Sequence, residues 1–340
     1  MMVQKSSILR VIRMLLVICW ATVPFYANAE RGFWRLEQAP TSPKILEAAK
    51  SIFQITVPTG ELVKVDLKRF PSALLAMQSL KDHADLNSGE RLLRERALTK
   101  CFKQKKDVCS LLSTFELGTG FLVGDRMTLV SAFHVFRDVL RSQSEKSFSI
   151  IIQDRNGKII FGSDVGDVAN VAFAHSSALQ TADKTSPIVD AIELKLSKAL
   201  SGFEPLTVGN DGDLKTGDAI INIGYPGPTY DRAKVLAKPD SDGVSQLATY
   251  GNVIDYSDYF KRTGKDINKV QNDLITLIKA ATFYTDSDSY FGMSGAPALN
   301  SIGEVVGMVI GSYPVDGSAS TQTSVGTIRA SWILNLRNLR

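Results

Sequence analysis

The 340-residue chain contains few of the residues on which metal and redox sites depend, with three cysteines and three histidines. These residues do not cluster with the spacing of a zinc site. We therefore expect no metal ion and no cofactor. The apolar run over residues 14–25 is short for a membrane span. Internal repeats and low-complexity segments are absent, which favours a globular chain.

The first 29 residues have the pattern of a signal peptide. Three basic residues, Lys5, Arg10 and Arg13, precede the apolar run, and Ala27-Asn28-Ala29 forms a small-x-small cleavage site. We expect cleavage before Glu30 and export of the chain. An uncleaved anchor is the alternative, although the apolar run is short for one.

Little net charge remains once this segment is removed. The formal net charge falls from +4 to +1, because residues 1–29 hold three basic residues and no acidic one. We therefore expect no nucleic-acid partner. Residues 64–106 differ, with 11 Lys and Arg against 5 Asp and Glu. This excess indicates either a solvated helical face or a docking or lid element for an acidic partner or an anionic envelope surface.

Two cysteines remain in the exported chain, Cys101 and Cys109. An even pair in an exported protein indicates one disulfide closing a small loop. Two free thiols are the alternative, since the spacing permits a bridge without requiring one. So low a cysteine content favours a bacterial envelope protein, located in the periplasm or outside the cell.

The sequence Tyr290-Phe291-Gly292-Met293-Ser294-Gly295-Ala296-Pro297 is typical of a nucleophile on a tight turn. Gly292 allows two backbone N–H groups to point at one position, where they would stabilise an oxyanion. Gly295 is expected to let a substrate approach without a side chain in the way. Glycine and serine also fill ordinary turns, so the hypothesis needs a histidine and an acid.

His134 has the surroundings of a general base. Apolar runs at residues 121–123 and 129–130 predict two short strands around the turn Gly124-Asp125-Arg126. The histidine follows the second strand, where a rigid sheet holds it. His83 and His175 lack such surroundings and are interpreted as ordinary surface or core residues.

Asp190 is the acid candidate. Ile192, Leu194 and Leu196 alternate with Glu193 and Lys195, which predicts a half-buried strand with the two charged residues outward. Asp190 precedes this strand, where its carboxylate can orient the ring of His134.

These motifs together resemble the chymotrypsin/trypsin-like serine proteases, and most closely the bacterial glutamyl-endopeptidase-like and HtrA-type enzymes. The resemblance rests on Gly118-Thr119-Gly120-Phe121-Leu122-Val123, Ser131-Ala132-Phe133-His134, the segment after Asp190, and Gly292-Met293-Ser294-Gly295. It implies His134 as base, Asp190 as its orienting acid and Ser294 as nucleophile. The backbone N–H groups of Gly292 and Ser294 would form the oxyanion hole.

The resemblance implies an all-β fold of two six-stranded antiparallel β-barrels with the site between them. We expect a trypsin-like serine protease domain over residues 30–340, with a basic helical insertion at about 64–113 and a C-terminal helix over 330–339. Ser42 and Pro43 predict a helix start, as cap and first helical residue. Only 46 residues follow Ser294, so no PDZ domain is expected.

The sequence indicates the substrate specificity less clearly than the catalytic residues. Asp288 lies six residues before Ser294, where the trypsin subfamily places the acid that binds Lys or Arg. A free carboxylate there would favour a cationic side chain, whereas a hydrogen-bonded structural aspartate would not. By similarity, Ile310, Gly311 and Ser312 would form the opposite wall of the pocket.

The sequence therefore predicts an exported serine endopeptidase acting on a protein or peptide through an acyl-enzyme. The alternative is a latent or weak protease-fold binding or chaperone-like module of the cell envelope, which the basic insertion favours. An esterase is a third option, but the Gly-x-Ser-x-Gly elbow and the Ser–Asp–His order of the α/β-hydrolases are absent. The oligomeric state is not indicated.

Overall fold

The computed structural model describes residues 33–36, 41–58, 62–80, 88–112, 115–142, 147–164, 166–174, 190–226, 246–262, 264, 276, 279–314 and 323–331. The signal segment and nearly all of the expected C-terminal helix lie outside these ranges. Within them, no helix is both long and apolar enough to cross a membrane.

The C-terminal half is a closed antiparallel barrel of six strands in the order β13-β12-β15-β16-β17-β14, which β14 closes by pairing with β13. A further strand, β1, is added beside β13. The strands are β1 (Phe33–Arg35), β12 (Ala219–Gly224), β13 (Leu247–Ile254), β14 (Thr282–Thr285), β15 (Pro297–Leu299), β16 (Val305–Pro314) and β17 (Thr323–Arg329). Closure leaves the barrel no free edge among its six strands.

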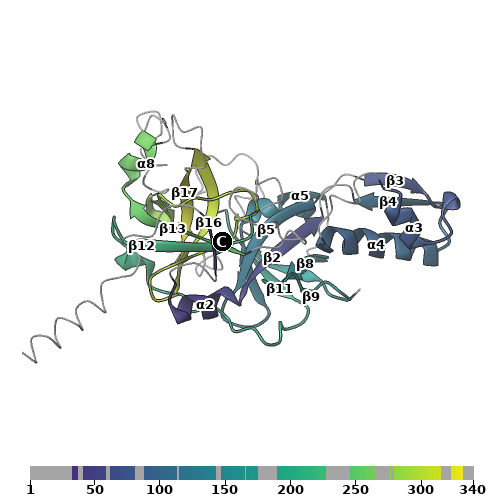
Figure 1. The fold of residues 1–340 in the computed structure, drawn as a ribbon, viewed down its shortest axis with the longest axis horizontal. Coiled ribbons are helices and arrows are strands. Elements are labelled where there is room, and N and C mark those ends of the chain that lie inside the picture. Colours follow the sequence, from purple (N-terminus) through teal and green to yellow (C-terminus); the bar gives the residue numbers. More distant parts are fainter. Residues whose placement is uncertain are drawn as a thin grey trace, which may run out of the picture.

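The N-terminal half is a curved antiparallel sheet in the order β7-β10-β11-β6-β5-β2-β8-β9. Its pairings among the described residues leave it open as a half-barrel beside the closed one (Figure 1). The strands are β2 (Ile52–Pro58), β5 (Phe115–Leu122), β6 (Thr128–Ser131), β7 (Ser147–Phe148), β8 (Ile151–Gln153), β9 (Ile159–Phe161), β10 (Ala169–Ala174) and β11 (Ile192–Leu196). The predicted all-β, chymotrypsin-like architecture is confirmed, with one closed six-stranded barrel; the described N-terminal half is an open sheet of eight strands where a second six-stranded barrel was expected.

Short helices connect and flank the two halves. They are α2 (Pro43–Ala49), η3 (Phe133–Val135), α5 (Arg137–Ser142), η4 (Asp211–Asp213) and α8 (Tyr256–Arg262). The predicted start of α2 is confirmed, because Ser42 Oγ accepts the N–H of Ile45 and Pro43 is the first helical residue. Such a cap satisfies one of the backbone donors that a helix end leaves unpaired.

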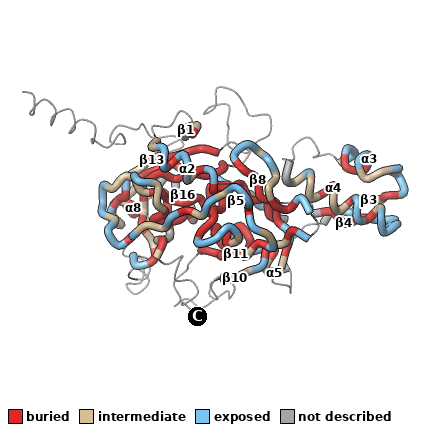
Figure 2. Tube along the Cα trace, turned by 90° about the horizontal axis from the view of Figure 1, so that it is seen from below, coloured by how far each residue is buried: buried red, intermediate tan, exposed pale blue. Residues whose placement is uncertain are grey.

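One hydrophobic core joins the two halves. It includes Phe53 and Phe121 from the N-terminal sheet and Ile223 and Met308 from the barrel, and Figure 2 shows the buried chain concentrated there. The phenol of the buried Tyr225, just after β12, donates to the carbonyl of Ile52 in β2 at 2.9 Å. Burial raises the pKa of this phenol, so it remains a neutral donor that ties one half to the other.

The strand that leads from Asp190 differs from its prediction in one respect. The alternation is present, but Glu193 is buried, only 7% exposed, and Lys195 is half-buried. Both faces of β11 are covered, and Glu193 and Lys195 each interact with other groups of the protein. Two-sided burial of a strand cannot be read from alternation alone.

The insertion is a small unit with its own fold, and it contains strands as well as helices. Its elements are β3 (Leu62–Asp66), η1 (Leu67–Arg69), α3 (Ala73–Gln78), α4 (Ser88–Lys103) and β4 (Val108–Leu112), with β3 paired antiparallel to β4. It interrupts two strands that pair directly, β2 and β5. It contacts the N-terminal sheet through α4, which touches β2 and β8.

The insertion unit (residues 62–112) has its own core, with Met77, Leu98 and Leu111 among its buried residues. Leu74, three residues before the buried Met77 in α3, is 58% exposed. The unit projects from the N-terminal sheet at the end opposite the C-terminal barrel, as both ribbon and tube views show (Figures 1 and 2). That position does not fit a lid over the junction of the two halves.

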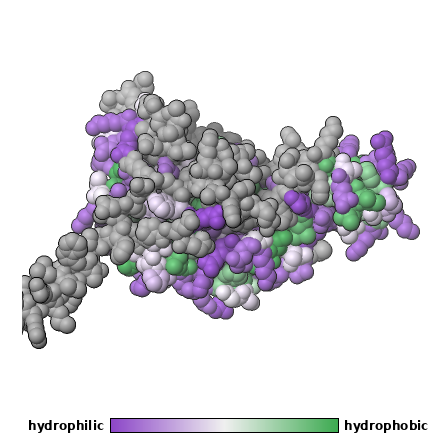
Figure 3. Space-filling view, viewed as in Figure 1, coloured by the Kyte–Doolittle hydropathy of each residue, from purple (hydrophilic) through white to green (hydrophobic). Residues whose placement is uncertain are grey.

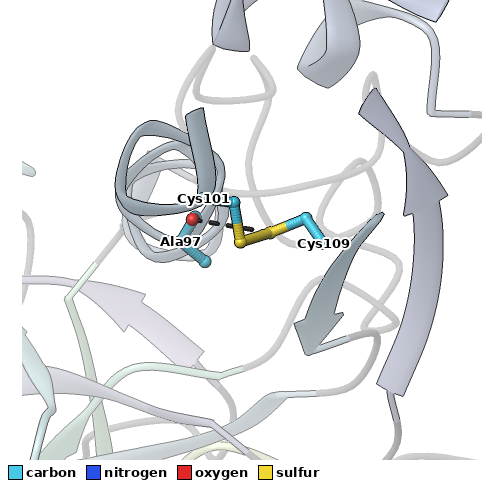
Figure 4. Close-up of a disulfide and its surroundings, with 3 residues drawn as sticks. All are labelled: Ala97, Cys101 and Cys109. Atoms are coloured by element: carbon cyan, nitrogen blue, oxygen red, sulfur yellow. Dashed lines mark hydrogen bonds between the residues drawn. A yellow bond between two sulfur atoms is a disulfide. The ribbon is translucent and has the colours of Figure 1, made fainter. Parts of the chain in front are cut away.

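The predicted disulfide is confirmed. Cys101 near the end of α4 and Cys109 in β4 are bonded, with their Cα atoms 5.8 Å apart (Figure 4). The Cys109 sulfur also lies 3.5 Å from the carbonyl oxygen of Ala97, a packing contact, since a disulfide sulfur has no proton to donate. The bond links the long helix of the unit to its sheet.

Candidate active site

His134 and Asp190 are brought together by two paired strands. Strand β6 ends at Ser131 and β11 begins at Ile192, and these two residues are opposite each other in the antiparallel register. A residue just after β6 and a residue just before β11 therefore lie at the same edge of the sheet. His134 is the middle residue of η3, between buried Phe133 and Val135, so its backbone is held by the core.

The Asp190 carboxylate makes two contacts with His134. Its Oδ2 is 2.5 Å from the ring Nδ1, and its Oδ1 accepts the backbone N–H of the same residue at 2.8 Å. The Asp190 side chain is 19% exposed and that of His134 is 38% exposed. Two contacts from one carboxylate orient the ring and leave Nε2 directed away from the acid.

The far side of the ring meets Ser294. Nε2 is 2.9 Å from Ser294 Oγ, across 160 positions of sequence. The structure therefore places Asp190, His134 and Ser294 in one hydrogen-bonded chain, with two members from the N-terminal half and one from the C-terminal barrel. In the described ranges, no three His, Cys, Asp or Glu side chains gather as a metal site would require.

Ser294 is presented by two consecutive turns. The N–H of Met293 donates to the carbonyl of Tyr290 at 3.0 Å, and the N–H of Ala296 donates to the carbonyl of Met293 at 2.8 Å. The third residue of each turn is a glycine with positive φ, +92° at Gly292 and +89° at Gly295. Type II turns require such a residue at this position. Ser294 is thus the second residue of the second turn.

Two backbone donors beside Ser294 are unused. Neither the N–H of Gly292 nor that of Ser294 donates to another group in the part of the chain that the structure describes, although Gly292 is buried. Buried backbone donors are nearly always paired. A pair of unused donors flanking a hydroxyl is the arrangement that an oxyanion hole requires.

The role expected for Gly295 needs correction. A Cβ added there would lie 2.0 Å from the carbonyl oxygen of Thr119 and 2.5 Å from Ser131 Oγ. The glycine is buried against the N-terminal sheet and does not face an approaching substrate. Its absent side chain allows the nucleophile loop to contact the other half of the molecule.

Thr119 is a residue of the site that the sequence analysis did not single out. Its N–H donates to the carbonyl of Ser294 at 2.9 Å, and its Oγ1 donates to the carbonyl of Gly292 at 2.8 Å. It is fully buried. The Gly-Thr-Gly motif marked this segment, but nothing local in the sequence indicates that the threonine contacts a loop more than 170 residues away.

The candidate specificity residues occupy two segments next to this loop. Asp288 is buried, 4% exposed, and interacts with other groups of the protein. Ile310 and Gly311 are half-buried at a bulge in β16. Ser312, also in β16, pairs with Val325 of β17. The side chain of Ser312 lies outside the described part. Bulges are common beside active sites, where they redirect side chains.

β16 is also bonded directly to the nucleophile loop. The carbonyl of Val309 accepts the N–H of Gly295, and its N–H donates to the carbonyl of Ala296, both at 2.8 Å. Phe291, which the sequence analysis did not weigh, is 78% exposed beside Gly292. Its ring lies nearly perpendicular to that of Tyr290, with centroids 5.5 Å apart. An apolar surface thus borders the two unused donors.

Comparisons with known proteins agree with this geometry. The family model described as a trypsin-like peptidase domain matches residues 118–308, which include the candidate base, acid and nucleophile. A comparison with curated proteins finds no match.

Among solved structures, the HtrA-type protease AlgW with a decapeptide is similar at 15% identity and a TM-score of 0.46, over 87% of this chain and 66% of that one. AlgW with a tripeptide is similar at 14% identity and a TM-score of 0.46, over 87% of this chain and 61% of that one. A serine endoprotease from Yersinia pestis is similar at 14% identity and a TM-score of 0.45, over 88% of this chain and 67% of that one. This chain thus spans about two thirds of their length or less. Values this low carry no conclusion about activity.

Proposed function

Because the chain belongs to the trypsin-like peptidase domain family, we propose that it is an exported serine endopeptidase that cleaves protein or peptide substrates through an acyl-enzyme. The observation that carries the proposal is the chain of contacts from Asp190 through His134 to Ser294, beside two unused backbone donors. Nucleophile, base, orienting acid and oxyanion donors are then assembled at one site.

In this mechanism Ser294 Oγ attacks the peptide carbonyl while His134 Nε2 accepts its proton. The negative charge that develops on the carbonyl oxygen is stabilised by the N–H groups of Gly292 and Ser294. Asp190 keeps the proton of the neutral ring on Nδ1 and stabilises the imidazolium that forms. His134 then protonates the leaving amine, and water releases the acyl group by the reverse sequence of proton transfers.

The test of the reaction is covalent labelling. Purified protein is incubated with a fluorophosphonate probe, the labelled residue is located by mass spectrometry, and Ser294→Ala is treated in parallel. We expect one label, on Ser294, and none in the variant. Folded protein that takes no label would contradict an assembled triad.

The second candidate is a protease-fold binding module that cuts little, and the insertion unit favours it. Lys100, Lys103, Lys105 and Lys106 are exposed at the end of α4 and just after it, and none makes an ion pair with a described residue. Figure 3 shows mainly hydrophilic side chains on this end of the molecule, around a smaller hydrophobic area. The unit is suited to an acidic partner or an anionic envelope surface.

Export and specificity have separate tests. Processing of the full-length chain in a bacterial host, followed by N-terminal sequencing, is expected to give Glu30 as the first residue. For specificity, a peptide library is cleaved by the wild type and by Asp288→Asn. Preference for Lys or Arg that the variant loses would assign Asp288 to the pocket. An unchanged profile would make it a structural aspartate.

A further inference from the structure

Thr119 contributes both its backbone and its side chain to the nucleophile loop from the other half of the molecule. The residue lies in β5 opposite Gln54 of β2. Its N–H bonds the carbonyl of Ser294 and its hydroxyl bonds the carbonyl of Gly292. The carbonyls of both residues whose N–H groups would form the oxyanion hole are therefore held by one threonine.

The hydroxyl lies in a site built to receive it. It donates to Gly292 and also accepts the backbone N–H of Tyr225 at 3.0 Å, so it is used as donor and as acceptor. A Cβ on Gly224 would lie 3.0 Å from this oxygen, and that position has none. The carbonyl of Thr119 itself accepts Ser131 Oγ at 2.7 Å, which holds the threonine from behind.

Gly292 is the member of the hole that most needs such support. A glycine at positive φ has a wide range of accessible backbone conformations, and its N–H has no partner of its own in the described structure. A bond to its carbonyl fixes the plane of the following peptide and so limits how the residue can rotate. A donor to an oxyanion acts only when it is oriented beforehand.

We propose that Thr119 is a positioning residue of the oxyanion hole, acting from the N-terminal sheet on the nucleophile loop of the C-terminal barrel. The inference rests on the proposed peptidase function for its effect on rate, but its effect on the loop does not depend on catalysis. Thr119→Val removes the hydroxyl at nearly constant volume and leaves the carbonyl of Gly292 and the N–H of Tyr225 unpaired.

The kinetic experiment compares Thr119→Val, Thr119→Ser and a matched control, Thr56→Val. Thr56 is fully buried in β2 of the same sheet, and its hydroxyl has no hydrogen-bond partner among the described residues. Losing a whole oxyanion donor costs about 10²–10³ in turnover, and we expect a misplaced one to cost about 10–100. Thr119→Val should lower kcat and the rate of fluorophosphonate labelling by that factor, with KM within about threefold of wild type. Thr119→Ser should recover most of the rate.

Three kinetic results would overturn the proposal. They are a Thr119→Val rate equal to wild type, a Thr119→Ser rate as low as that of Thr119→Val, and an equal loss in Thr56→Val. The second would assign the effect to packing of the methyl group, and the third to any change inside this sheet.

Hydrogen exchange separates this proposal from the peptidase function itself. The amides of residues 292–296 should exchange faster in Thr119→Val than in wild type or Thr56→Val, whether or not the protein takes the probe. If Thr119→Val does not fold, Thr119→Ala removes the hydroxyl with less volume to accommodate. Unchanged exchange in a folded variant would reject Thr119 as the support of this loop. An unlabelled wild type would reject only the peptidase function.

Discussion

The N-terminal sheet and the C-terminal barrel hold their parts of the site in different ways. His134 and Asp190 lie at one edge of the sheet because β6 and β11 are antiparallel neighbours in a fixed register. Ser294 lies on two turns outside any strand, supported by two glycines and by bonds from Thr119. The base and acid are thus placed by a strand ladder within one half, whereas the nucleophile is placed by its own turns, by Val309 of β16 and by contacts from the other half.

The difference shows where the site is robust. A strand ladder distributes its support over many backbone bonds, so one substitution outside the site has little effect on the His–Asp pair. The loop depends on a few contacts, with Val309 of β16 and with one segment of β5 in the other half. We therefore expect changes at the junction of the halves to affect the nucleophile before they affect the base.

The largest effect is expected from Asp190→Asn, which tests the pair within the sheet. If the asparagine oxygen keeps the bond from the His134 backbone N–H, its NH₂ group faces Nδ1 and requires the ring to carry its proton on Nε2. That tautomer cannot accept the proton of Ser294. We expect kcat to fall by about 10⁴, with little change in KM, measured by steady-state kinetics.

The control is Asp167→Asn, a buried aspartate of the same half that accepts the N–H of Gly162. Its activity should stay within about twofold of wild type. Similar losses in both variants would mean that the sheet, and not the triad, had been disturbed.

Gly295→Ala tests the contact between the halves. The new Cβ would meet the Thr119 carbonyl at 2.0 Å while the backbone is at φ +89°, so the loop must move. We expect a loss of at least about 10² in labelling rate and of about 3 kcal/mol or more in the free energy of unfolding. Gly202→Ala has nearly the same φ, +86°, with nothing within 4 Å. It should cost only about 1 kcal/mol and leave activity intact, and equal effects would refute the steric argument.

The disulfide extends the comparison to the insertion unit. Cys101→Ser with Cys109→Ser removes the link between α4 and β4, and we expect the unit to lose about 2–3 kcal/mol of local stability. Hydrogen exchange over residues 62–112 should rise while kcat and KM remain unchanged, because the unit is built on its own core. Mild reduction of wild type should give the same pattern. A parallel fall in activity would show that the unit supports the site.

The smallest effect, a change in the free energy of unfolding, is expected at the turn between β5 and β6. The Lys195 ammonium holds the pKa of the Asp125 carboxyl well below its ordinary range. A depressed folded-state pKa stabilises the protein above the unfolded value near 4, and this contribution is lost as the pH falls from there toward the folded-state pKa. The carboxyl is 52% exposed, so screening limits the effect to less than about 1 kcal/mol.

The contribution of the Asp125 carboxylate to stability is measured by urea unfolding at pH 7 and at pH 3. Asp125→Asn should be less stable than wild type at pH 7, and the difference should shrink at pH 3. The same comparison in a Lys195→Gln background should show little pH dependence. A difference that stays constant with pH would assign the effect to the Asp125 bond with the N–H of Met127.

Local pattern was sufficient for the features that depend on neighbouring residues. Apolar runs and the Gly-Asp-Arg turn located the two strands before His134, and Ser42-Pro43 located the start of α2. The cysteine count predicted the disulfide because two cysteines remain outside the expected signal segment, and they have one pairing available. The family motifs identified the fold class for the same reason, since each is a short continuous segment.

Tertiary structure alone decided the rest. The burial of Glu193 follows from the covering of both faces of β11, the need for glycine at 295 from the approach of Thr119, and the position of the insertion unit from the contacts of α4 with β2 and β8. Each depends on segments far apart in sequence. A one-dimensional pattern records the polarity and size of a residue, but the group that will lie against it is set only when the two halves pack.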